Sequence, residues 1–163
     1  MDGYDATLYG ATLAKSPTKE NNYGYEVIGA NSAVFTENDI VTAVAGAGLE
    51  VAAPSTPVIG VVARTETMAS NNATVAKITP AYIPIDQDYD FLMGTNADLN
   101  PLNVGSYYNI TGTTGAQQVD VAGGITTGSN AIVKLTKVDP NQLGGTGAGS
   151  GLRQGYFRFI SLI

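Results

Sequence analysis

The chain has 163 residues, of which 13% are charged and 44% hydrophobic, with 20 Gly, a formal net charge of −6 and no His, Cys or Trp. This length fits one domain, and the missing His and Cys exclude a Ser-His-Asp triad, an HExxH zinc site, a thiolate nucleophile and a disulfide framework. The eight basic residues are dispersed along the sequence rather than massed, so we expect neither a nucleic acid nor an anionic membrane as partner.

Residues 1–25 indicate an extended N-terminal arm. Residues 1–5 are acidic and lack the basic and apolar regions of a secretory signal. Ser16-Pro17 interrupts any helical pattern, and the Asn-Asn-Tyr-Gly-Tyr run at 21–25 is typical of a turn. Tyrosine is common at interfaces because its ring packs while its hydroxyl finds a partner. The candidate interface residues of the arm are Tyr4, Tyr9, Tyr23 and Tyr25, unless these rings cover the arm's own domain.

From residue 26 onward, short β-type runs alternate with clusters of Gly, Pro, Asn and Ser, which predicts a single β domain over residues 26–163. We expect strands at 26–28, 33–36, 40–45, 49–52, 57–63, 73–79, 82–85, 89–93, 106–110, 118–121, 131–138 and 156–163. The best helix candidate, residues 38–47, is disfavoured by its β-branched residues and by Gly46.

Two of these runs are clear enough to place side chains. Alternation within 131–138 directs Val133 and Leu135 to one face, and alternation within 156–160 directs Phe157 and Phe159 inward. The run at 58–62 looks buried on both faces, with Gly60 marking a bulge or a close approach of another backbone. The expected fold is therefore an all-β domain with an antiparallel sheet that has one wet side.

The Gly-rich segment 144–151 predicts a loop before the last strand. It lacks the GxxxxGK[ST] and GxGxxG spacings, and a β-type run follows it, so phosphate binding is not expected. Arg153, directly after the glycines, is a further interface candidate because Arg is enriched at interfaces.

The three carboxylates Asp86, Asp88 and Asp90 form the one candidate metal cluster. At i, i+2 and i+4 of an extended segment they project from one face, and Ca²⁺ takes such oxygen ligands. Phe91 and Ala97 stand where an EF-hand loop has its Gly and its Glu. A solvated acidic face is the simpler interpretation, and we expect no cofactor.

Several segments together resemble a known family. They are Asp39-Ile40-Val41, the run at 58–62, Gly105-Ser106-Tyr107-Tyr108-Asn109-Ile110, the run from Ile132 to Pro140 and the closing Tyr156-Phe157-Arg158-Phe159-Ile160. With the N-terminal arm, this Gly/Ala/Thr-rich β chain is similar to the capsid decoration, or cement, proteins of tailed bacteriophages.

The resemblance implies a compact antiparallel β-barrel or sandwich as the fold. It also implies a non-enzymatic virion protein on the outer surface of a phage capsid. Members of the family are usually homotrimers, bind the major capsid protein and stabilise contacts between its subunits. Two other interpretations stay open. One is a carbohydrate-binding or adhesive β-sandwich, for which Asp86, Asp88 and Asp90 are the candidate Ca²⁺ ligands, and the other is a tail-associated structural protein. An enzyme working through carboxylates and Tyr is a third, although general acid–base catalysis most often recruits His.

Overall fold

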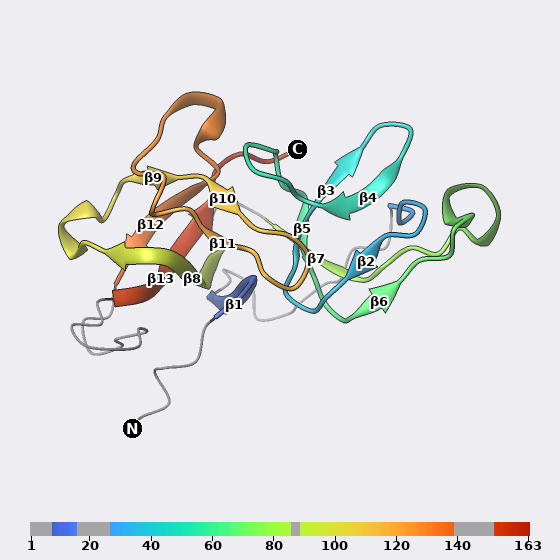
Figure 1. The fold of residues 1–163 in the computed structure, drawn as a ribbon, viewed down its shortest axis with the longest axis horizontal. Coiled ribbons are helices and arrows are strands. Elements are labelled where there is room, and N and C mark those ends of the chain that lie inside the picture. Colours follow the sequence, from blue (N-terminus) through green and yellow to red (C-terminus); the bar gives the residue numbers. More distant parts are fainter. Residues whose placement is uncertain (1–7, 16–26, 86–88, 139–151) are drawn as a thin grey trace, which may run out of the picture.

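The computed structural model describes residues 8–15, 27–85, 89–138 and 152–163. Within them the chain is built of strands with three short helical turns, which confirms the predicted all-β class. Figure 1 shows two halves along the long axis of the molecule, one holding β8 to β13 with β1 and the other holding β2 to β7. None of the helical turns in these residues is long and apolar enough to span a bilayer.

The first half is a nearly closed, barrel-like sheet. Its neighbouring strands follow the order β10-β11-β8-β13-β12-β9, and β1 pairs with β8. The first and last strands of this order, β10 and β9, are separated in the chain by Asn109 alone, so the two ends of the sheet lie next to each other. The β8–β11 pair is parallel and the others are antiparallel, so the sheet is mixed rather than purely antiparallel. The bounds are β1 Ala11–Lys15, β8 Asp90–Leu99, β9 Tyr107–Tyr108, β10 Ile110–Thr111, β11 Gln118–Val119, β12 Val133–Lys137 and β13 Leu152–Phe159.

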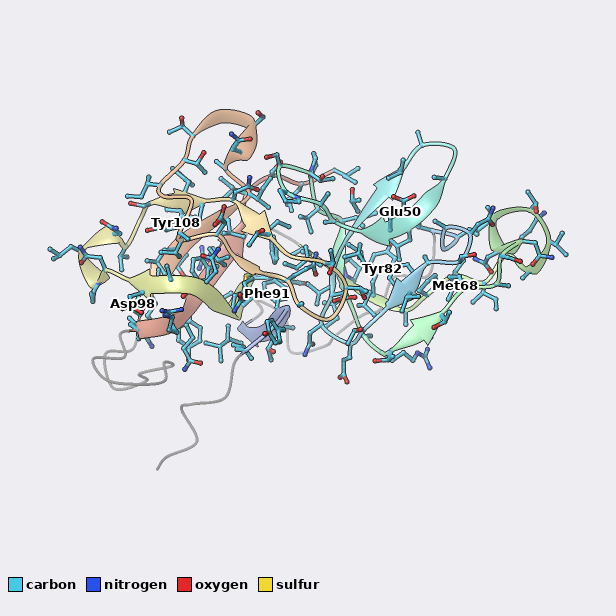
Figure 2. All side chains as sticks on the ribbon, viewed as in Figure 1. Glu50, Met68, Tyr82, Phe91, Asp98 and Tyr108 are labelled. Atoms are coloured by element: carbon cyan, nitrogen blue, oxygen red, sulfur yellow. The ribbon has the colours of Figure 1, made fainter. Side chains whose placement is uncertain are left out.

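Alternating side chains fill this sheet as the sequence predicts. Val133, Leu135, Phe157 and Phe159 are all fully buried. The ring of Phe159 meets that of Phe91 edge-on, with centroids 5.2 Å apart, an arrangement that adds to the stability gained from burial. Figure 2 labels Phe91 and Tyr108 in this half of the molecule.

The second half contains a four-stranded sheet and a two-stranded ribbon. The sheet has the order β4-β3-β5-β7, and β2 pairs with β6. Its separate core consists of Phe35, Val41, Leu49, Val62, Met68 and Tyr82. The bounds are β2 Val34–Phe35, β3 Ile40–Val44, β4 Gly48–Val51, β5 Gly60–Val62, β6 Glu66–Thr67 and β7 Tyr82–Pro84.

Gly60 in β5 marks a close approach, as predicted. A Cβ at this position would lie 2.4 Å from Cδ2 of Tyr82 and 2.7 Å from the carbonyl oxygen of Ile83. Only glycine lets β7 pack this closely against β5.

The predicted strand at 73–79 is wrong. Residues Asn72–Ala76 form a π-helical turn, η2, which ends at Lys77 in the left-handed conformation. Asn72 is fully buried, and its side chain donates to the carbonyl oxygens of Gly29 and Ile78 and accepts from the Ile78 N–H. These bonds to the backbone override the β preference of the neighbouring residues.

Other elements differ less from the expectation. Within the helix candidate 38–47, Ile40–Val44 form strand β3 rather than a helix, whereas β6 has no predicted counterpart. Residues 27–28 of the predicted strand 26–28 form no strand, and residue 26 lies outside the described residues. Of the predicted arm, residues 8–15 are described, and they contribute β1. The remaining turns are the 3₁₀ elements η3 (Pro101–Asn103) and η4 (Gly128–Asn130).

Candidate functional site

The four arm tyrosines predicted as interface residues are only partly described. Tyr9 is 44% exposed, next to β1. Tyr4, Tyr23 and Tyr25 lie outside the described residues, as does the Gly-rich segment 144–151. Tyr9 is therefore the one arm tyrosine that the structure describes, and the interface role of the four tyrosines stays a prediction.

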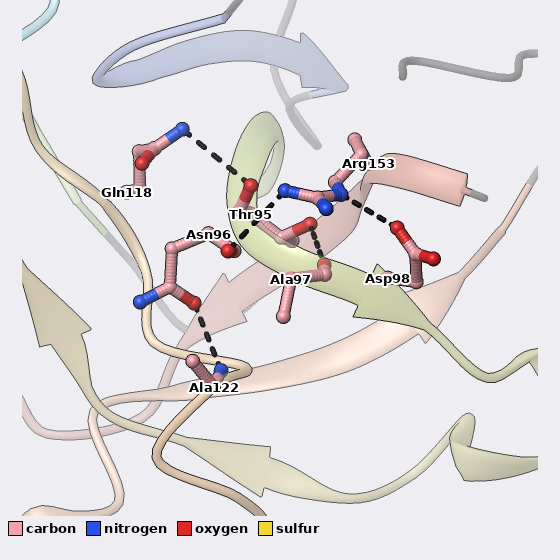
Figure 3. A network of polar contacts seen from close by, with 7 residues as sticks. All are labelled: Thr95, Asn96, Ala97, Asp98, Gln118, Ala122 and Arg153. Carbon is pink, nitrogen blue, oxygen red and sulfur yellow. Dashed lines mark hydrogen bonds and ion pairs between the residues drawn. The ribbon is translucent and has the colours of Figure 1, made fainter. Parts of the chain in front are cut away.

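Arg153, the other predicted interface residue, binds within its own chain (Figure 3). Its Nε donates to Oδ1 of Asp98 at 2.6 Å, and its Nη1 donates to the carbonyl oxygen of Asn96 at 3.3 Å. The same stretch of β8 is held further by the Thr95 hydroxyl, which donates to the Ala97 carbonyl at 2.7 Å. Arg153 thus fixes the path of β8 from β13, although 44% of its side chain is exposed.

The carboxylate cluster predicted as a metal candidate is represented by Asp90. Its Oδ1 accepts from Nε of Arg158 at 2.6 Å, so this carboxylate has a cationic partner. Asp86 and Asp88 lie outside the described residues. Among the residues that the structure describes, no three acidic side chains are grouped closely enough to hold a metal ion.

One concave site is an apolar groove where the second half meets the β10–β11 turn. We call it the groove, a cavity of about 440 Å³. Its lining comprises Ala30, Ala33, Val34, Val51, Ala52 and Pro54, with Glu50 and the turn residues 112–114. The Val34 side chain is 46% exposed at this site.

Buried Asp39 holds the β10–β11 turn in position as one wall of the groove. Its carboxylate accepts hydrogen bonds from the Thr114 hydroxyl and from the Gly115 N–H. It also accepts from the Thr36 N–H at 2.8 Å. The Thr114 hydroxyl lies 3.0 Å from the carbonyl oxygen of Val34, so the turn lies directly against β2.

Gln117, also fully buried, joins the same two parts of the chain. Its Oε1 accepts from the Ile40 N–H at 2.7 Å, and its Nε2 donates to the carbonyl oxygens of Ile40 and Ala52. Ala52 follows β4 and lines the groove. The Gln117 amide therefore fixes the end of β4 relative to β11.

The outer edge of β4 is open along the groove. Leu49 directs both its backbone groups away from β3, since its N–H donates to Ile28 and its C=O accepts from Ala30. Two residues later, Val51 must direct its N–H and C=O to the same side. None of the described residues pairs with it there. Within the part of the chain that the structure describes, the groove thus has one backbone donor and one acceptor in its wall that no residue pairs with.

The sequence did not point to this groove. Its residues come from three separate stretches of the chain, and their Ala, Val, Thr and Pro side chains carry no motif. The only available signal was Asp39, an acidic residue directly before the predicted strand at 40–45.

Comparison with known proteins gives no relative for this fold and groove: no protein-family model, curated protein or solved structure matches the chain.

Proposed function

We propose that this chain is a non-enzymatic structural protein of a virion, which binds the outer surface of a tailed-phage capsid. Its partner is the major capsid protein, and it stabilises the contacts between capsid subunits as a homotrimer. The proposal starts from the resemblance to capsid decoration proteins and is supported by the groove.

The single observation that carries it is an apolar groove beside an open strand edge. An extended segment of a partner protein gains main-chain hydrogen bonds by pairing with a free strand edge, and its side chains fill neighbouring pockets. The Val51 N–H and C=O supply the edge, and Val34 and Ala52 supply the apolar walls. This site suits a peptide segment better than a small polar substrate, because its lining is mostly aliphatic.

The amino-acid composition fits a protein that binds its partner through many weak contacts rather than through one high-affinity site. Only 13% of the residues are charged, so the surface is mainly neutral and polar. A protein bound in many copies, each at more than one point, gains affinity through avidity without needing a large interface.

The test is co-sedimentation with capsids assembled without this protein. Wild-type protein should pellet with them in a saturable, stoichiometric manner. Val34→Glu places a carboxylate in the groove, where burial by the partner segment would desolvate it, and should weaken binding by about tenfold or more. Val44→Glu is the matched control, because Val44 is 39% exposed at the end of β3 and does not line the groove.

Two results would count against the proposal. Wild-type protein that stays in the supernatant would reject capsid binding itself. Equal binding by the two variants would show that the groove is not the contact.

A further inference from the structure

Four strands of the barrel-like sheet bring basic and tyrosine residues into one row on its outer face. Tyr107 in β9 is the register partner of Lys134 in β12, and Lys134 is the partner of Arg158 in β13. Arg158 in turn reaches Asp90 in β8. These residues are far apart in the sequence, and only the sheet makes them neighbours.

The direction of this row follows from its buried neighbours. Tyr108, Val133 and Phe157 point into the core with 2% exposure or less, so the residues that alternate with them point outward. The next position along the face holds Lys137 and Tyr156, which a bulge in β12 places opposite each other. We call Tyr107, Lys134, Lys137, Tyr156 and Arg158 the basic face.

Lysine lies over tyrosine at both positions. The Lys134 Nζ lies 5.9 Å from the centroid of the Tyr107 ring, and the Lys137 Nζ lies 5.4 Å from that of Tyr156. Such cation–π contacts hold the ammonium groups near the sheet. Their charges are thereby presented in fixed positions.

The face is positive in a chain that is negative overall. Among the described residues, three cations lie on it together with the carboxylate of Asp90, whereas the whole chain carries −6. Asp90 is itself mostly covered, with 16% of its side chain exposed against 38% for Arg158. The basic residues that are dispersed in the sequence are therefore partly gathered by the fold.

The face is also hollowed at its two ends. One cavity of about 350 Å³ is lined by Ala14, Asp90, Lys137 and Tyr156. Another of about 340 Å³ lies against Tyr107, Ala131 and Ile160. A partner surface with projecting side chains can fill these two cavities, whereas a flat partner surface cannot.

We propose that the basic face docks an acidic protein surface. This rests on the proposed function and deepens it: the acidic surface belongs to the capsid, and the face sets which side of the molecule meets it. An acidic partner repels most of a chain of net charge −6 and attracts this face, so charge complementarity selects the orientation. Tyrosine and arginine are the residues that interface cores favour.

Protein is a better partner than nucleic acid for this face. A protein that binds DNA through phosphates neutralises many of them with Lys and Arg, whereas this face has three cations interleaved with two tyrosines and a carboxylate. The groove lies where the second half meets the β10–β11 turn, whereas the basic face lies on β9, β12 and β13, so one molecule contacts its partner at two separate places.

The test uses capsids assembled without this protein and measures binding in low and high salt. Lys134→Glu with Lys137→Glu reverses two charges of the face and should raise the dissociation constant at low salt by about tenfold or more. The wild-type constant should rise with salt, and that of the double variant should depend on salt much less. Arg64→Glu with Lys77→Glu reverses two exposed charges in the other half and is the matched control, expected within about twofold of wild type.

Each outcome has a distinct meaning. Wild-type protein that fails to bind capsids rejects the proposed function and this inference together. Wild-type binding with equal affinity for both double variants overturns the basic face and leaves capsid binding intact. If the face variant instead loses binding to duplex DNA or to phosphatidylserine vesicles while capsid binding is unchanged, the acidic-protein assignment is wrong.

Discussion

Gln117 shows how single buried polar residues hold the two halves of this molecule together. It has no exposed surface, and its amide satisfies the backbone of Ile40 and Ala52 in the other half. Asp39 also joins the two halves, but it belongs to the second half. Its carboxylate accepts hydrogen bonds from the Thr114 hydroxyl and the Gly115 N–H of the β10–β11 turn. Buried polar groups of this kind stabilise only when all partners are present, because an unpaired buried group is costly.

Truncating Gln117 should therefore be severe. Gln117→Ala leaves the Ile40 N–H and the Ala52 carbonyl without their partner and opens a cavity, which should lower the free energy of unfolding by about 2–4 kcal/mol. Urea denaturation measures this change.

The adjacent residue provides the control. Gln118 is half-buried, and its side chain makes a single long contact of 3.5 Å to the Thr95 carbonyl. Gln118→Ala should change the free energy by less than about 0.5 kcal/mol. Equal losses for the two variants would contradict the role given to Gln117.

At the scale of elements, β1 links the arm to both halves. Ala11 opposite Met93 is fully buried, and its N–H donates to the Asn38 carbonyl in the second half. The preceding Gly10 N–H donates to the Gln117 carbonyl at 2.9 Å. The strand therefore belongs to the folded core rather than only to an arm that reaches for a partner.

Two neighbouring positions of β1 test this placement. Ala11→Asp puts a carboxylate into the core and should destabilise the protein by at least about 3 kcal/mol. Thr12, one residue further on, is exposed, and Thr12→Asp should stay within about 0.5 kcal/mol of wild type. Thermal unfolding of the two variants makes the comparison, and similar melting temperatures would show that β1 does not pack on β8 as described.

Sequence reasoning predicted the elements whose pattern is local. The alternation around Val133 and Phe157 is enough to place those side chains, and Gly60 marks the close contact with β7. It failed for 73–79 because the side chain of Asn72 bonds to Gly29, a residue far away in the sequence. The groove and the basic face could not be predicted, since each combines residues from strands whose pairing the sequence does not specify.

Across the whole molecule, the core of the barrel-like half extends into the second half through Ile40, Ala52, Val58 and Val61. Polar bonds join the halves as well and form a junction between them. Besides Asp39, Gln117 and β1, the C-terminal residues bridge the halves: the Val58 N–H donates to the Ser161 carbonyl at 2.8 Å, and the Ile163 N–H donates back to Val58. Ser55 adds a contact, its N–H donating to Oδ1 of Asn109.

This junction predicts one cooperative unfolding transition. Some backbone groups of each half have their hydrogen-bond partner in the other half. If one half unfolded alone, these groups would lose their partners, which is costly, so the halves should unfold together. Calorimetry should give a single peak whose calorimetric and van't Hoff enthalpies agree. Two resolved peaks would show that the halves are independent domains.

Capsid binding, the proposal on which the others depend, can be seen directly. Cryo-electron microscopy of capsids assembled without the protein, imaged before and after it is added, tests it. We expect new density on the outer surface at repeated sites, in groups of three, with the basic face toward the capsid. Capsids that look the same before and after addition would contradict it.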